Sequence, residues 1–84
     1  MLFVLPLQPA NAAQVTLAWD QNPEPDIAGY KMHYGLDSDP YEYTVDVGNY
    51  TECTISGLVE GTTYYFAVTA YNTQDLESDY SNEV

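Results

Sequence analysis

Basic side chains are almost absent from this sequence. Its 84 residues include one lysine, Lys31, and no arginine, against thirteen aspartates and glutamates, so the formal net charge is −12 and the isoelectric point is near 4.1. Nucleic acids and anionic membrane surfaces are bound mainly through lysine and arginine. The composition therefore argues against both as partners and leaves cations, basic proteins and neutral glycans.

Cysteine is equally scarce. With Cys53 alone, the chain cannot form the internal disulfide that commonly stabilises small secreted domains. Cys53 has the same parity as Ile55 in a short predicted strand over residues 51–55, and no cation stands near it in the sequence to lower its pKa. We expect a buried, inert thiol and a core held together by packing alone.

Catalytic motifs and long apolar runs are also missing. The sequence contains no Gly-x-Ser-x-Gly, no His-Glu-x-x-His and no Cys-x-x-Cys. The apolar stretch at residues 2–7 is far shorter than the roughly 20 residues of a membrane-spanning helix. The lone histidine, His33, is predicted to be exposed on the outer face of a strand. A chain of this length builds one small domain without a deep cleft, so we expect no enzyme.

The sequence does contain a clear alternation of apolar and polar residues. After a turn at residues 58–63, every second residue from Tyr64 to Ala70 would face a core. Every second residue from Tyr65 to Tyr71 would face outward. The remaining predicted strands cover residues 15–19, 29–35, 41–47 and 51–55, with the start of another at 80–84. Short strands separated by turn residues predict an all-β sandwich or barrel.

Four aromatic and aliphatic positions in these strands carry a family resemblance. Trp19 ends Leu17-Ala18-Trp19, Tyr30 lies in residues 29–34, and Leu58 and Tyr64 flank the turn before the long strand. Their order and spacing over residues 15–84 resemble the fibronectin type III domain. The resemblance implies an immunoglobulin-like two-sheet sandwich in which all four are structural core residues. It also implies a tyrosine corner, in which the Tyr64 hydroxyl returns to the backbone near Leu58.

Two strands of that family are short in this sequence. Strand A is either replaced by the apolar leader or missing, and strand G, entered at residues 77–84, is truncated. An unpaired sheet edge is a template for another strand. One alternative is therefore a self-assembling filament or fibre subunit, in which residues 2–7 of one copy complete the sheet of a neighbour as a donor strand.

The first 13 residues are uncharged and end in small side chains. Ala10-Asn11-Ala12 fits the pattern of a signal-peptide cleavage site, although no basic residue precedes the apolar part. We interpret residues 1–13 as a signal-peptide remnant or an apolar N-terminal strand, which Pro6 would restrict to an edge. Residues 14–84 then form the fibronectin type III domain. Export would place the chain outside the cell, on its surface or in the periplasm.

Two loops at the same end of the predicted sandwich are rich in acidic residues. Asp20, Glu24 and Asp26 lie in the first, and Asp75, Glu77 and Asp79 in the second. Calcium favours such oxygen-rich loops, which makes it the one cofactor that the sequence offers. Their spacing differs from that of an EF-hand, however, and we favour the simpler interpretation that they are solvated loop acids without a cofactor.

The resemblance implies a non-catalytic interaction or spacer module of a secreted or surface protein. Its partner would be a protein or glycan at the cell surface, or a second copy in the donor-strand alternative. A carbohydrate-binding accessory module would share the fold and differ only in its ligand. Outward tyrosines such as Tyr65 and Tyr71 could stack on sugar rings or simply pack across strands.

Overall fold

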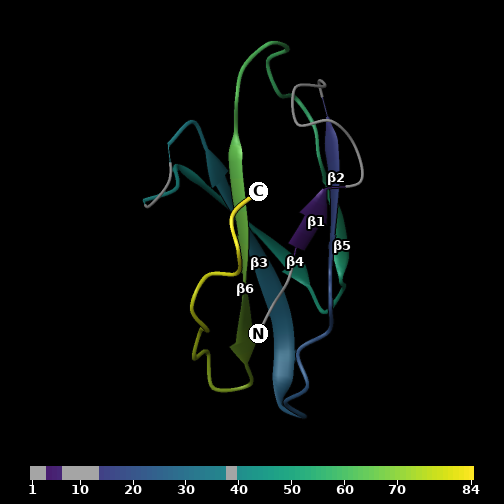
Figure 1. Cartoon of the computed structure of the whole chain (residues 1–84). Helices are drawn as coiled ribbons and strands as arrows, with labels where there is room; N and C mark the ends of the chain where they lie inside the picture. Colours follow the sequence, from purple (N-terminus) through teal and green to yellow (C-terminus); the bar gives the residue numbers. More distant parts are fainter. Residues whose placement is uncertain (1–3, 7–13, 38–39) are drawn as a thin grey trace.

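The protein is a sandwich of two antiparallel sheets. The computed structural model describes residues 4–6, 14–37 and 40–84, which contain six strands and no helix that could cross a membrane. The strands are β1 (Val4–Pro6), β2 (Val15–Trp19), β3 (Ile27–Gly35), β4 (Tyr43–Gly48), β5 (Glu52–Ile55) and β6 (Tyr65–Asn72). Sheet A has the order β1-β2-β5 and sheet B the order β4-β3-β6 (Figure 1). The predicted all-β, immunoglobulin-like two-sheet fold is confirmed.

The N-terminal segment supplies the first strand of sheet A. β1 pairs with β2 of the same chain, with Val4 opposite Trp19 and Pro6 opposite Leu17. β1 is an edge strand, where the missing N–H of a proline is tolerated. The position of strand A is thus taken by the chain's own leader, so the gap that motivated the donor-strand alternative is filled. The expected cleavage site at residues 10–12 lies outside the described residues.

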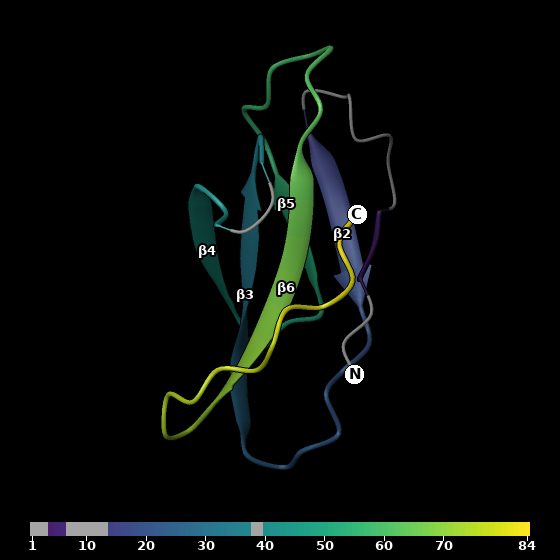
Figure 2. The ribbon, with the colours of Figure 1, turned by 60° about the vertical axis from the view of Figure 1, so that its left-hand side comes forward.

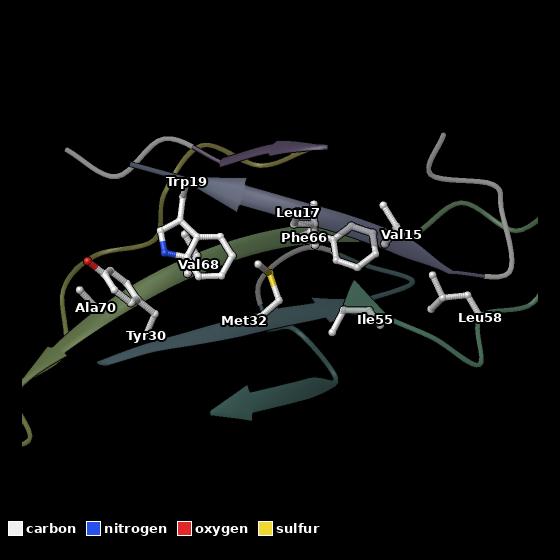
Figure 3. Packing of buried hydrophobic residues seen from close by; sticks show 10 residues of the cluster. All are labelled: Val15, Leu17, Trp19, Tyr30, Met32, Ile55, Leu58, Phe66, Val68 and Ala70. Atoms are coloured by element: carbon white, nitrogen blue, oxygen red, sulfur yellow. The ribbon is translucent and has the colours of Figure 1, made fainter. Parts of the chain in front are cut away.

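The core between the sheets is built from one parity of β2, β3, β5 and β6, as the alternation predicts. Trp19 packs against Tyr30 at one end, with ring centroids 5.7 Å apart. At the other end Tyr34 stacks on Phe66, with centroids 5.7 Å apart. The buried hydrophobic cluster comprises Val15, Leu17, Trp19, Tyr30, Met32, Ile55, Leu58, Phe66, Val68 and Ala70 (Figure 3).

The residues expected to form the structural core all contact this cluster. Trp19, Tyr30 and Leu58 are buried, and Tyr64 is half-buried and packs against them. The Tyr64 hydroxyl accepts a hydrogen bond from the backbone N–H of Val59 at 3.1 Å. This contact joins the start of β6 to the turn that precedes it, one residue beyond Leu58.

The C-terminal segment (residues 77–84) lies along the free edge of β6, although it is not a regular strand. Every second residue of β6 meets every third residue of the segment, and the main-chain bonds measure 2.8–3.0 Å. At two of the three steps a serine hydroxyl replaces the segment's carbonyl as the acceptor for a β6 N–H. The pairs are Phe66 with Val84, Val68 with Ser81, and Ala70 with Ser78. The predicted last strand is therefore present as an irregular pairing.

Candidate functional site

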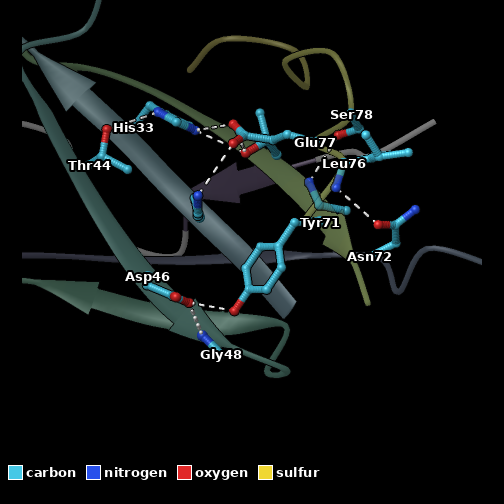
Figure 4. Close-up of polar contacts among 12 residues, drawn as sticks. His33, Thr44, Asp46, Gly48, Tyr71, Asn72, Leu76, Glu77 and Ser78 are labelled. Carbon is cyan, nitrogen blue, oxygen red and sulfur yellow. Dashed lines mark hydrogen bonds and ion pairs between the residues drawn. The ribbon is translucent and has the colours of Figure 1, made fainter. Parts of the chain in front are cut away.

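A polar cluster built on His33 occupies the outer face of sheet B (Figure 4). His33 is on β3, and its Nδ1 lies 3.1 Å from the Thr44 hydroxyl on β4. Its Nε2 lies 2.9 Å from the Thr69 hydroxyl on β6 and 3.3 Å from a Glu77 carboxylate oxygen in the C-terminal segment. One imidazole ring therefore contacts three neighbouring segments, and with its own strand it joins four parts of the chain.

The hydrogen bonds fix where the proton of the neutral imidazole lies. Thr69 donates its hydroxyl proton to Glu77 at 2.8 Å, so its oxygen must accept from His33 Nε2–H. His33 Nδ1 then accepts from the Thr44 hydroxyl. Burial lowers the pKa of His33 below its ordinary value, and outweighs the opposing effect of the Glu77 carboxylate. The neutral ring is therefore the favoured form at neutral pH.

The expectation that His33 is exposed was wrong. Only 7% of the residue is accessible to solvent. The Tyr80 ring meets the imidazole edge-on at a centroid distance of 5.1 Å, and the Tyr41 ring, 5.2 Å from that of Tyr80, lies 6.3 Å from the imidazole. The parity of β3 placed His33 correctly on the outer face, but these side chains from distant parts of the sequence cover it.

Lys31 and Glu77 continue the cluster along the sheet. The Lys31 ammonium nitrogen lies 3.5 Å from Glu77 Oε1 and 5.4 Å from the centroid of the Tyr71 ring. Partial burial would raise the pKa of Glu77, but the Thr69 hydroxyl and the charges of Lys31 and His33 outweigh it and hold that pKa below its ordinary value. Glu77 is therefore an ionised anchor for the C-terminal segment.

The Tyr71 side chain reaches from β6 across β3 to β4. Its hydroxyl donates to Asp46 on β4 at 2.8 Å, and the same carboxylate oxygen accepts from the Gly48 N–H at 3.0 Å. These two bonds lower the pKa of Asp46, and the bond to Asp46 raises the pKa of Tyr71. The tyrosine passes over Gly29, where an added Cβ would collide with its hydroxyl. Tyr71 thus makes the cross-strand packing that was one of its two expected roles.

The His33 cluster contains the groups of a nucleophile and a base, but a substrate could not reach them. A hydroxyl, an imidazole and a carboxylate lie within hydrogen-bonding distance, as nucleophilic catalysis requires. Thr69, however, is only 1% exposed, so a substrate atom could not reach its oxygen. What the arrangement can do is hold β3, β4, β6 and the C-terminal segment together.

Acidic residues of the two loops approach each other, and Glu24, Asp26 and Glu77 line one hollow of about 230 Å³. Within residues 4–6, 14–37 and 40–84, no three histidine, cysteine, aspartate or glutamate side chains form a group that could hold a metal ion. Glu77 instead belongs to the His33 cluster, while the other five, Asp20, Glu24, Asp26, Asp75 and Asp79, are exposed. Cys53 is half-buried, and burial, together with the charge of Glu52, raises its pKa to about 11.

Two further hollows lie on the surface of the sandwich. A polar one of about 400 Å³ lies at the loop between β2 and β3 and is lined by Gln21, Asn22, Pro23, Glu24, Pro25, Ile27 and Asn49. A smaller one of about 190 Å³, here called the β4 groove, is lined by Tyr34, Leu36, Glu42, Tyr43, Ser56, Gly57, Leu58 and Tyr64. The second has aromatic walls and adjoins an edge strand.

The side chains of β4 beside this groove are unexpectedly exposed. Tyr43 and Val45 have the inward parity, yet they are 47% and 38% accessible to solvent. β4 is the outermost strand of sheet B, and Figure 2 shows it standing beyond the strands of sheet A. Alternation shows on which side of a strand a residue lies. It does not show whether the opposite sheet extends far enough to cover that residue.

Comparisons with known proteins agree with this architecture. A family model described as the Fibronectin type III domain matches residues 5–84. A Kelch domain-containing protein of Saccharolobus solfataricus is 41% identical over 63 residues, which are 75% of this chain but only 8% of that protein. A Fn3-like protein from Clostridium thermocellum superposes with a TM-score of 0.72 at 26% identity, over 95% of this chain and 81% of the other.

A further structural neighbour is an enzyme. Pectate lyase PelI from Erwinia chrysanthemi, solved in complex with tetragalacturonic acid, superposes with a TM-score of 0.75 at 17% identity. The match covers 99% of this chain and 27% of the lyase chain. At this identity the likeness concerns the fold alone.

Proposed function

This chain belongs to the fibronectin type III family, and from that membership we propose that it is a non-catalytic interaction and spacer module of a larger secreted or surface protein. Its curated relative is far longer than the matched part, and only 27% of the lyase chain is covered. A small domain repeated in such different contexts is suited to connecting or presenting other parts of a protein.

The observation that carries the spacer proposal is the direction of the chain through the sandwich. β1 starts at Val4, opposite Trp19, at the end of the core where Trp19 meets Tyr30. The C-terminal segment reaches Val84 opposite Phe66, further along the same core. Figures 1 and 2 show β1 and the end of this segment on the same side of the sandwich, partway along its 39 Å axis, so parts attached at the two ends would project from one side of a compact domain.

Small-angle scattering of a tandem protein tests this geometry. Two copies of residues 4–84 joined directly should give a particle whose largest dimension exceeds the 39 Å of one copy. In a matched control, about ten glycine and serine residues between the copies should broaden the distance distribution, because such linkers are flexible coils. A tandem protein hardly longer than one copy would contradict the spacer role.

A carbohydrate-binding accessory module is the second candidate, and the tetragalacturonic acid bound by the pectate lyase favours its consideration. The outer face of sheet B speaks against it, since the Tyr71 hydroxyl is engaged by Asp46 and Lys31 lies over the ring. Titration with oligogalacturonate, followed by calorimetry, separates the two: heat of saturable binding would support the accessory module.

A further inference from the structure

β4 is an open edge of sheet B. In the part of the chain that the structure describes, β3 is its only strand neighbour, and Figure 2 shows no ribbon paired along its outer side. The opposite edge of the sheet, at β6, is paired with the C-terminal segment. An unpaired edge presents N–H and C=O groups to solvent and can accept another strand.

Two common devices that protect a sheet edge are absent from β4. Proteins often place lysine or proline on such a strand, and the sequence of β4, Tyr43 to Gly48, contains neither residue. Its register with β3 shifts only at one end, where the extra residue Val47 forms a bulge on β4, and the pairing from Tyr43 to Asp46 is regular. The edge is therefore chemically competent to pair.

The side chains of β4 specify what an added strand must look like. Toward the β4 groove, Tyr43 and Val45 expose apolar surface, and Leu36 beside them is 51% exposed. On the other face Asp46 is exposed, whereas Glu42, just before β4, lines the groove itself. A paired strand would meet mainly apolar groups on one face and the Asp46 carboxylate on the other, with Glu42 at the rim of the groove.

Charge decides between a second copy and a different partner. Pairing β4 with β4 of another copy would bring acidic faces together, and each chain already carries a net charge of −12. Like charges across neighbouring strands are destabilising, whereas opposite charges are favourable. The same carboxylates would attract a basic strand and increase its association rate.

We propose that the β4 edge and the β4 groove bind an extended peptide strand of a partner protein in which apolar or aromatic residues alternate with lysine or arginine. The main-chain groups of β4 pair with the peptide, the groove receives its apolar side chains, and the carboxylates of Asp46 and Glu42 attract its cations. This inference rests on the proposed interaction function and deepens it by naming the surface and the chemistry of the partner.

The test is a binding measurement with a fluorescent peptide of about eight residues, a common strand length, in which lysine alternates with valine. Fluorescence anisotropy should show saturable binding to the intact chain that weakens as salt is added. Val45→Lys places an inward-pointing charge on the edge and should weaken binding by about tenfold or more. Leu76→Lys makes the same charge change at a residue that is 64% exposed in the loop after β6. It should leave the affinity within about twofold of wild type.

Two N-methylated forms of the peptide make the test independent of any protein variant. Successive N–H groups of a strand point to opposite sides, so methylation of alternate nitrogens blocks one edge of the peptide or the other without changing its charge. One form should bind like the parent peptide and the other should not bind. Because both are measured on the wild-type chain, the comparison is decisive even if Val45→Lys does not fold, which circular dichroism would reveal.

Several outcomes would overturn the proposal. Equal binding of the two N-methylated forms, or of a peptide with the same composition in scrambled order, would reduce the effect to general electrostatic attraction. A glutamate-valine peptide that binds as well would remove the charge argument. A dimer that Val45→Lys disrupts, seen by light scattering, would make a second copy the occupant. An oligogalacturonate that binds wild type but not Val45→Lys would make the groove a glycan site. Any of these results leaves the spacer geometry to be judged by the tandem scattering.

Discussion

The buried hydroxyl of Thr69 is the most sensitive single point of the His33 cluster. Thr69→Val keeps the shape and the β-branching of the side chain but removes an oxygen that accepts from His33 at 2.9 Å and donates to Glu77 at 2.8 Å. Because Thr69 is 1% exposed, water cannot replace the lost group. The variant should unfold at lower denaturant concentration than wild type.

The expected size follows from these two hydrogen bonds. A net hydrogen bond contributes about 0.5–1.5 kcal/mol, and one to a charged group about 1.5–3 kcal/mol. The Glu77 side chain is 37% exposed and can be solvated, and His33 Nε2 retains this carboxylate at 3.3 Å. Both considerations reduce the loss, and we expect about 1.5 kcal/mol in the free energy of unfolding. For a domain of this size that corresponds to a decrease in Tm of about 6–12 °C.

Urea unfolding followed by the fluorescence of Trp19, the only tryptophan, measures this change. Thr16→Val is the matched control, because the Thr16 hydroxyl meets only the Thr54 hydroxyl at 2.9 Å in an exposed pair. The control should stay within about 0.5 kcal/mol of wild type, as surface substitutions do. If Thr69→Val unfolds like Thr16→Val, the cluster does not hold the sheet together and the reasoning fails.

Three further predictions concern titration, reactivity and metal binding. Burial lowers the pKa of His33, so the unfolded chain binds a proton more readily and the folded state loses stability as the pH falls below 6.5. In His33→Gln this loss should be smaller, as urea unfolding at about pH 7.5 and pH 5.5 would show, and an unchanged difference between the two pH values would contradict it. Cys53, with its pKa raised to about 11, should react with iodoacetamide far more slowly in the native protein than in urea, and equal rates by mass spectrometry would disprove its protection. Because the loop acids form no metal-binding group among the described residues, about 5 mM calcium should leave Tm unchanged relative to EDTA, and an increase would reveal a site.

Local alternation predicted the fold because it requires no knowledge of distant contacts. The parity of residues 15–19 and 64–70 placed their apolar side chains correctly in the core, and the boundaries of β2 are those predicted. Trp19 and Tyr30 could be recognised in the same way, since large aromatic residues at the inward parity of two strands meet between the sheets.

The candidate sites depend on contacts that no local pattern encodes. His33 is buried by Tyr80 and Glu77, which are more than forty positions further along the chain. Tyr43 and Val45 show the converse, because their inward parity is correct but sheet A does not extend over them. The C-terminal segment escaped the period-two pattern because its serine hydroxyls substitute for main-chain acceptors and change the step to three residues.

The irregular pairing of the C-terminal segment also limits how this protein can associate through sheet B. The segment meets β6 at every third residue, so it is not a regular strand that could present evenly spaced groups to a further strand. Among the described residues, sheet B therefore has one regular open edge, at β4. We expect strand addition at this sheet to stop after one partner, because repeated addition into a fibre needs a second open edge.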